Sequence, residues 1–121
     1  MMIRGVRGAI TISSDSEKEI ISSTELLLLE MINKNGIEPE QVASVFISAT
    51  ADIHTAFPAR ALRKIKNWKY VPVLSMQEME VKDSLNKCIR IMIHWNTEKK
   101  QEDIRHVYLR KAHTLRPDLL S

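Results

Sequence analysis

The clearest alternation of apolar and polar residues runs over residues 87–96 and predicts a strand. One face of this strand is apolar and consists of Ile89, Ile91, Ile93 and Trp95. The opposite face carries Cys88, Arg90, Met92 and His94. A guanidinium stays charged and is costly to bury without a partner, so an arginine in the middle of such a strand marks a candidate for function.

The rest of the chain shows four further strands and two helices. β-Branched residues predict a strand over residues 2–12. Apolar residues at three- and four-residue intervals predict an amphipathic helix over residues 16–35, which begins in a capping box and ends at Asn35-Gly36. The remaining elements are a short helix that begins near Pro58 and strands at residues 43–50, 70–74 and 104–109. This order predicts one α+β domain over residues 1–121, a mixed sheet with helices on one face.

Composition narrows the class of protein. The 121 residues are 44% hydrophobic and 27% charged, as in ordinary globular domains. The net charge of +3 admits a small anion or nucleic acid as partner, but the basic residues are spread along the chain and no nucleic-acid motif occurs. The single cysteine, Cys88, excludes an internal disulfide, and no apolar run could span a bilayer. We therefore expect a cytoplasmic protein without nucleic-acid or membrane partners.

Three charged residues within apolar surroundings are the candidates for chemistry. Arg90 and Arg7 lie in the middle of predicted strands, and Glu78 lies between Gln77 and Met79. Each arginine is either part of a structural ion pair or a ligand for an anion, and Glu78 is either its salt-bridge partner or a contact to a ligand. The four histidines lack metal-ligand spacing, and neither a glycine-rich phosphate loop nor a Ser-His-Asp arrangement is present. We expect no metal and no cofactor.

A series of short motifs extends over nearly the whole chain. They are Arg4-Gly5-Val6-Arg7-Gly8-Ala9, Ser48-Ala49-Thr50, Asp52, Phe57-Pro58-Ala59, Val71-Pro72, Gln77-Glu78-Met79, Cys88-Ile89-Arg90, His94-Trp95-Asn96-Thr97, His106-Val107-Tyr108-Leu109 and Leu115-Arg116-Pro117-Asp118. In this order and at this spacing they resemble the monofunctional, trimeric chorismate mutases. The resemblance implies a homotrimer whose sheets form a pseudo α/β barrel, with three sites in clefts between subunits. A shared site also suits a chain that is too small to enclose a large cavity by itself.

The resemblance implies an isomerase that rearranges chorismate to prephenate in phenylalanine and tyrosine biosynthesis, with no cofactor. Its implied catalytic residues are Arg90, Glu78 and Arg7. Its implied substrate-binding residues are Tyr108, Ser75, Leu74, Met76, Gln77, Phe57, Ala59, Arg60, Arg63, Val73, Leu115 and Arg116.

The resemblance also implies how these residues divide between two subunits. One subunit supplies Arg7, Glu78, Arg90 and Tyr108, and the tail at residues 116–121 closes over the site with Leu115 and Arg116. The neighbouring subunit supplies Phe57, Ala59, Arg60, Arg63, Val73, Leu74 and Ser75.

Three positions depart from the best-known members of that family. Leu74 and Ser75 stand where those members have threonine and cysteine, and Arg60 stands where a lysine is common. Ser75 can still exchange hydrogen bonds with a ring hydroxyl, whereas Leu74 offers only its backbone groups. An alternative resemblance is to the trimeric reactive-intermediate deaminases, which bind small 2-imino or 2-keto acids beside an arginine between subunits.

Overall fold

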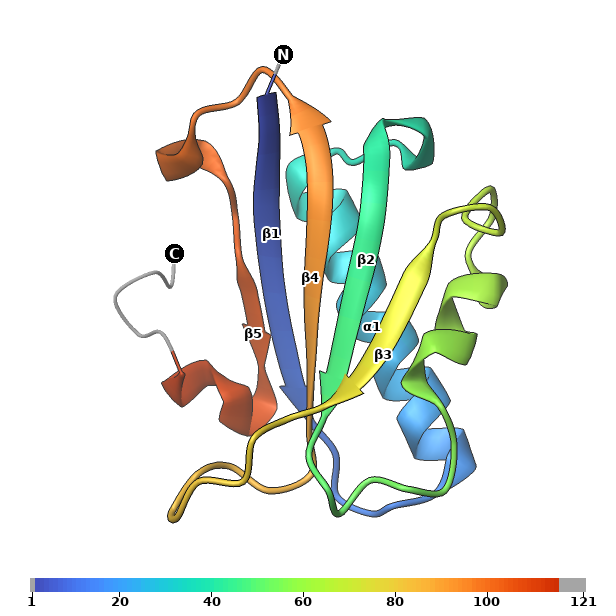
Figure 1. Ribbon diagram of the computed structural model, residues 1–121, viewed down its shortest axis with the longest axis vertical. Helices are drawn as coiled ribbons and strands as arrows, with labels where there is room; N and C mark the ends of the chain where they lie inside the picture. Colours follow the sequence, from blue (N-terminus) through green and yellow to red (C-terminus); the bar gives the residue numbers. More distant parts are fainter. Residues whose placement is uncertain (1, 116–121) are drawn as a thin grey trace.

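The computed structural model describes residues 2–115 and contains a five-stranded mixed sheet in the order β3-β2-β4-β1-β5 (Figure 1). The strands are β1 (Met2–Thr11), β2 (Val42–Ala49), β3 (Val73–Gln77), β4 (Cys88–Thr97) and β5 (Val107–Leu109). The central strand β4 is antiparallel to both β1 and β2, while β3 and β5 pair in parallel at the two edges. The predicted mixed sheet is confirmed.

Helix α1 (Glu17–Asn35) covers one face of the sheet and lies behind it in Figure 1. Its start and end follow the predicted local signals. The Ser16 side chain accepts a hydrogen bond from the Glu19 N–H, and Gly36 has the left-handed φ of 73° that ends the helix. The apolar stripe of α1 is fully buried against the sheet and includes Ile20, Leu27, Leu28 and Met31.

The predicted short helix is the 3₁₀ helix η2 (Pro58–Lys64). Its buried residues Ala61 and Leu62 join the same core as α1, so both helices pack against one face of the sheet. Three shorter 3₁₀ helices are η1 (Pro39–Gln41), η3 (Gln101–Asp103) and η4 (Arg110–Thr114). In the part of the chain that the structure describes, no helix is long and apolar enough to cross a membrane.

Two of the predicted strands begin three residues later than predicted, and the bounds of the other three strands differ from the prediction by one residue. The strand predicted at residues 70–74 begins only at Val73 and continues to Gln77. Pro72 has no N–H, but its carbonyl accepts the first bond of the β2–β3 ladder, from Val45 at 2.9 Å. The strand predicted at residues 104–109 is only β5, because the β1 register pairs no residue before Val107.

The second face of the sheet, which we call the open face, is turned toward the reader in Figure 1. At one corner, η4 packs on it where Ala112 contacts the buried residues Ala9, Cys88 and Tyr108, and Leu85 packs against the same cluster. The open face therefore differs from the helix-covered face, where apolar residues of β4 such as Ile91 and Ile93 are fully buried.

Candidate active site

The strand register brings the candidate residues of the open face into two rows. One row crosses all five strands and consists of Tyr108, Ala9, Arg90, Ser48 and Met76. The adjacent row contains Arg7, Met92, Phe46 and Leu74. Residues that pair directly across strands point to the same face, so two arginines and a tyrosine from three strands share this surface.

The Arg90 guanidinium forms an ion pair with Glu78, with 3.2 Å between Arg90 Nε and Glu78 Oε2. Both side chains are only 27% exposed. Ser48 donates a hydrogen bond to the same carboxylate oxygen at 3.3 Å, so Glu78 is held from two strands. This confirms that Glu78 is the salt-bridge partner of one of the predicted arginines.

The ion pair leaves the Nε–H group of Arg90 without an acceptor. Nε is buried, and among the described residues it has no hydrogen bond, although Glu78 Oε2 lies within 3.2 Å. The N–H bond is therefore not directed at that oxygen, because a hydrogen bond needs an aligned donor as well as a short distance. Buried donors are almost always paired in proteins, so this one is available to an acceptor that enters the site.

Tyr108 presents a second unpartnered polar atom on the open face. Its hydroxyl is buried and finds no hydrogen-bond partner within residues 2–115. The ring packs in a small apolar cluster with Ala9, Cys88 and Ala112, against which Leu115 also packs. Since Tyr108 and Arg90 share one row, the two unsatisfied donors face the same side of the sheet.

Cys88 belongs to this cluster as a packing residue. Burial raises the pKa of its thiol, and the nearby Arg90 guanidinium offsets only part of that effect. The thiol is therefore protonated at neutral pH, and the thiolate form needed for nucleophilic attack is scarce.

The predicted site residues in and next to η2 do not lie beside Arg90 in one chain. Arg60 and Arg63 belong to η2, on the face of the sheet that α1 covers, and Arg60 is paired with Glu17 at 2.9 Å. Phe57 directly precedes η2 and is 70% exposed. The sheet thus separates these residues and Ala59 from the open face.

The edge strand β3 divides its predicted residues between the two faces. Leu74 and Met76 pair with Phe46 and Ser48 and lie on the open face, whereas Val73, Ser75 and Gln77 alternate to the opposite side. All five residues of β3 are exposed. Leu115 is the last described residue, so Arg116 and the predicted closing tail lie outside the described residues.

Sequence reasoning gave no role to two residues that support this site. Ser48 contacts Glu78, and Asp52 accepts hydrogen bonds from the backbone of Lys87, shortly before Arg90. Both lie in motifs of the resemblance, but only the strand pairing shows what they contact. Within residues 2–115, no group of three or more histidine, cysteine, aspartate or glutamate side chains is arranged to hold a metal.

Comparison with known proteins identifies the family. A family model described as chorismate mutase type I matches residues 3–119. The chain belongs to this family. It is 51% identical to chorismate mutase AroH of Bacillus subtilis (strain 168) over 119 residues, which cover 98% of this chain and 94% of that protein. It is 47% identical to chorismate mutase AroH of Thermus thermophilus over 121 residues, 99% of this chain and 98% of that protein.

A solved structure supports the family assignment at the level of the fold. A chorismate mutase from Clostridium thermocellum superposes with a TM-score of 0.86 at 44% sequence identity. The match covers 89% of this chain and 96% of that one. The family predicted from the sequence motifs is confirmed, and so is the mixed-sheet fold.

Proposed function

We propose that this chain rearranges chorismate to prephenate in a cleft between two subunits of a homotrimer. The observation that carries the proposal is the row of donors on the open face of a type I chorismate mutase fold. Arg90 and Tyr108 lie two strands apart, which is roughly 10 Å between their backbones. Two donors at that separation suit a small dicarboxylate such as chorismate.

The reaction is a [3,3] pericyclic rearrangement, in which the ether C–O bond breaks as a new C–C bond forms. It needs neither a nucleophile nor a transfer of protons or electrons. A protein accelerates it by holding the enolpyruvyl group over the ring, in a conformer that the dianion rarely adopts in water. It also accelerates it by stabilising the negative charge that grows on the ether oxygen.

We assign Arg90 to the ether oxygen and the carboxylate next to it. Its guanidinium is held by Glu78 while its Nε–H remains available, so a fixed cation is in place before the substrate arrives. Arg7 and Tyr108 bind the side-chain carboxylate. Glu78 accepts a hydrogen bond from the ring hydroxyl and balances the charge of Arg90 when the site is empty.

The second half of the site comes from a neighbouring subunit in this proposal. Phe57, Ala59, Arg60 and Arg63 lie across the sheet from Arg90, so they can line its cleft only from another copy. A surface that would suit such a contact is the exposed apolar stretch that follows the unpaired edge of β3. It comprises Val73, Leu74, Met76, Met79 and Val81.

The neighbour also supplies the residues that shape the cleft. Ser75 shares the ring hydroxyl with Glu78, and Leu74 lines the same edge. Met76 and Gln77 are further substrate-binding residues of β3 in this proposal, and they are not assigned to either subunit. Phe57 and Val73 form apolar walls that favour the compact conformer, and Arg63 attracts the dianion. Leu115, Arg116 and the rest of the C-terminal tail close the entrance of the cleft.

Two further predictions from the sequence stay predictions. They are that residues 1–121 form a single domain and that the protein is cytoplasmic.

Replacement of Arg90 tests the catalytic assignment. Loss of one preorganised donor typically lowers turnover by about 10²–10³, which corresponds to roughly 3–4 kcal/mol. Arg90→Ala should lose at least that much in a chorismate-consumption assay with identification of prephenate. Arg90→Lys should also lose most turnover, because an ammonium cannot replace the guanidinium fork. Turnover of an imino acid by the wild type, without prephenate formation, would instead support the deaminase alternative.

Mixed assemblies test the shared site. Arg90→Ala damages one half of each cleft and Arg63→Ala damages the other half, so each variant alone should have low activity. Random assembly of the two co-expressed variants leaves about a quarter of the clefts with both arginines, because each cleft draws its halves from two chains. Recovery of about a quarter of wild-type activity is expected. Activity no higher than the mean of the two separate variants would contradict a site between subunits.

A further inference from the structure

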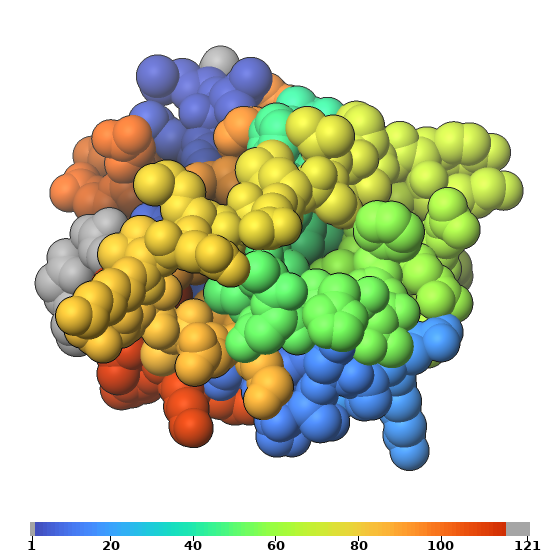
Figure 2. Space-filling view, turned by 60° about the horizontal axis from the view of Figure 1, so that its bottom comes forward, coloured from blue at the N-terminus to red at the C-terminus, as the bar shows by residue number. Residues whose placement is uncertain are grey.

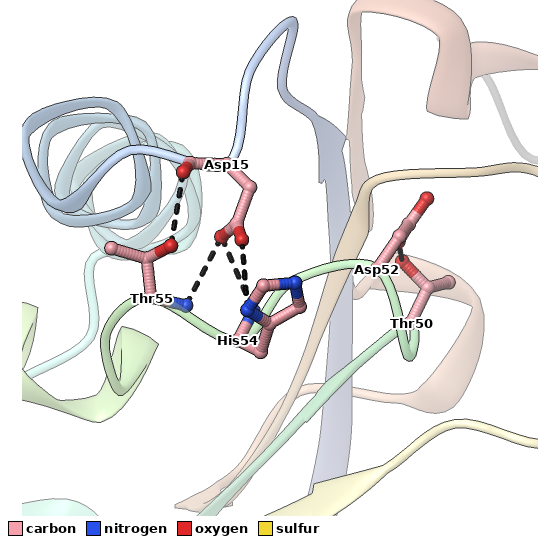
Figure 3. Close-up of polar contacts among 5 residues, drawn as sticks. All are labelled: Asp15, Thr50, Asp52, His54 and Thr55. Carbon is pink, nitrogen blue, oxygen red and sulfur yellow. Dashed lines mark hydrogen bonds and ion pairs between the residues drawn. The ribbon is translucent and has the colours of Figure 1, made fainter.

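The loop at residues 50–57, between β2 and η2, is held by side-chain hydrogen bonds toward both of its ends (Figure 3). Toward η2, the Asp15 carboxylate accepts hydrogen bonds from the backbone N–H groups of His54 and Thr55, at 3.1 and 3.2 Å. Next to β2, the Thr50 hydroxyl donates a hydrogen bond to Asp52. Figure 3 shows these two side chains turned toward each other, apart from the Asp15 group.

Thr50 and Asp52, at the end of the loop next to β2, also bind the backbone of residues 87 and 88. Lys87 donates its N–H to both carboxylate oxygens of Asp52, at 3.1 and 3.0 Å. Cys88 donates its N–H to the Thr50 hydroxyl oxygen at 3.0 Å, and its carbonyl accepts the Thr50 N–H at 3.0 Å. Two consecutive residues, 87 and 88, are therefore bound to two side chains that are themselves hydrogen-bonded to each other.

The segment held in this way is the connection between β3 and β4. It runs across the surface at this end of the sheet (Figure 2, yellow to orange), and its own residues line one pocket together with Thr50 and Asp52. Lys87 has a φ of 46° and Asp83 a φ of 65°, which is uncommon for residues other than glycine. Such a conformation persists where surrounding contacts fix it, and the Asp52 carboxylate supplies those contacts at Lys87.

Two of the three catalytic candidates lie at the ends of this connection. Arg90 follows Cys88 by two residues on the same face of β4, and Glu78 stands at the other end of the connection. Glu78 donates its N–H to the carbonyl of Ala49, the residue before Thr50. The Thr50–Asp52 pair thus sits where the chain segments that carry the ion-paired Arg90 and Glu78 meet.

We propose that Asp52 is a positioning residue, which sets the placement of Arg90 through the backbone of residues 87 and 88. The proposal rests on the role assigned above to Arg90. Asp52 bonds to protein backbone and to Thr50 only, among the described residues, so its effect on the reaction passes through β4. A misplacement of about 1 Å at a reacting centre can cost on the order of 10² in rate.

Substitution of Asp52 separates this role from general stability. Asp52→Ala removes both acceptors of the Lys87 N–H, and we expect kcat on chorismate to fall about 10- to 100-fold with little change in KM. Asp52→Asn keeps one carbonyl oxygen that can accept this bond, so it should recover most of the loss. Asp83→Asn, in the same connection, is the matched control and should leave kcat unchanged, because asparagine also tolerates a positive φ.

Each variant is assayed well below its thermal midpoint, beside Arg90→Ala. Wild-type kcat in folded Asp52→Ala would overturn the proposal, and so would an equal loss in Asp52→Asn and Asp52→Ala. If Arg90→Ala is inactive in those cases, only the positioning role of Asp52 fails. Full activity of Arg90→Ala on chorismate would refute the role assigned to Arg90, and a wild type that forms no prephenate would refute the proposed function itself. Should Asp52→Ala not fold, Thr50→Val and Thr50→Ser replace it, with loss of kcat expected in the first and not in the second.

Discussion

Replacement of Tyr108 by phenylalanine should raise stability while it weakens substrate binding. The hydroxyl is buried and lacks a hydrogen-bond partner within residues 2–115, and the residue is only 6% exposed. Burial of an unpaired hydroxyl costs about 1–3 kcal/mol in proteins. Phenylalanine removes the hydroxyl and keeps the ring among Ala9, Cys88 and Ala112, so the apolar packing is retained.

The expected gain is about 1 kcal/mol in the free energy of unfolding of the ligand-free protein, the lower part of that range. For a domain of this size, the gain corresponds to a rise of roughly 3–5 °C in Tm. In the complex proposed above, the same hydroxyl donates a hydrogen bond to the side-chain carboxylate of the substrate. A bond to a charged group contributes about 1.5–3 kcal/mol, so KM for chorismate should rise roughly 10- to 150-fold.

The assay combines thermal unfolding without ligand, at one protein concentration, with initial rates over a range of chorismate concentrations. Tyr70→Phe is the matched control, because Tyr70 is 88% exposed and its hydroxyl is already solvated, so neither quantity should change. A lower Tm for Tyr108→Phe together with a wild-type KM would refute the reasoning. That result would mean that the hydroxyl serves the fold and not the ligand.

Two further predictions concern the fold around the site. Gly8→Ala would place a methyl group 2.4 Å from Met31 Sδ, under α1. The free energy of unfolding, measured by denaturant titration, should fall by about 1–3 kcal/mol. Unchanged stability would show that α1 is not in tight contact with β1 at Gly8. The pKa of Glu19 is lowered to about 2, first by the backbone N–H of Ser13 and then by the Ser13 and Ser14 hydroxyls. Because its folded pKa lies below its unfolded value of about 4.3, the stabilisation is complete at neutral pH and is lost as pH falls from about 4.5 toward 2. Glu19→Gln should therefore be less stable at pH 7 and show a flatter decline over that acid range, whereas parallel pH–stability curves would contradict the assignment.

The elements that the sequence predicted well are those with local signals. The Ser16–Glu19 contact and Gly36 delimit α1, because capping depends on residues within a turn of each other. The alternation over residues 87–96 gives β4 and places Arg90 opposite the core face, because side chains alternate strictly along a strand. The bounds of β3 were missed, since they depend on where the backbone of β2 offers partners.

The sequence identified the main charged residues of the candidate site but only some of the contacts that they make. Spacing singled out Arg90, Arg7 and Glu78, and left open whether each serves an ion pair or a ligand. The structure confirms the ion pair of Arg90 with Glu78. Among the described residues the Arg90 Nε–H has no acceptor, so a contact to a ligand stays a prediction. Nothing in the sequence indicated that Ser48 would reach Glu78, because those residues are 30 positions apart.

The sequence alone determined which residues can form strands and α1, which face of each is apolar and to which family the motifs point. Only the tertiary structure decided the strand order β3-β2-β4-β1-β5, the row that joins Tyr108 to Arg90, and the hydrogen bonds from Asp52 to the backbone of Lys87. The physical reason is the range of the interactions. Helix caps and side-chain alternation act between near neighbours, whereas strand register and buried ion pairs join segments that meet only after the chain has closed long loops.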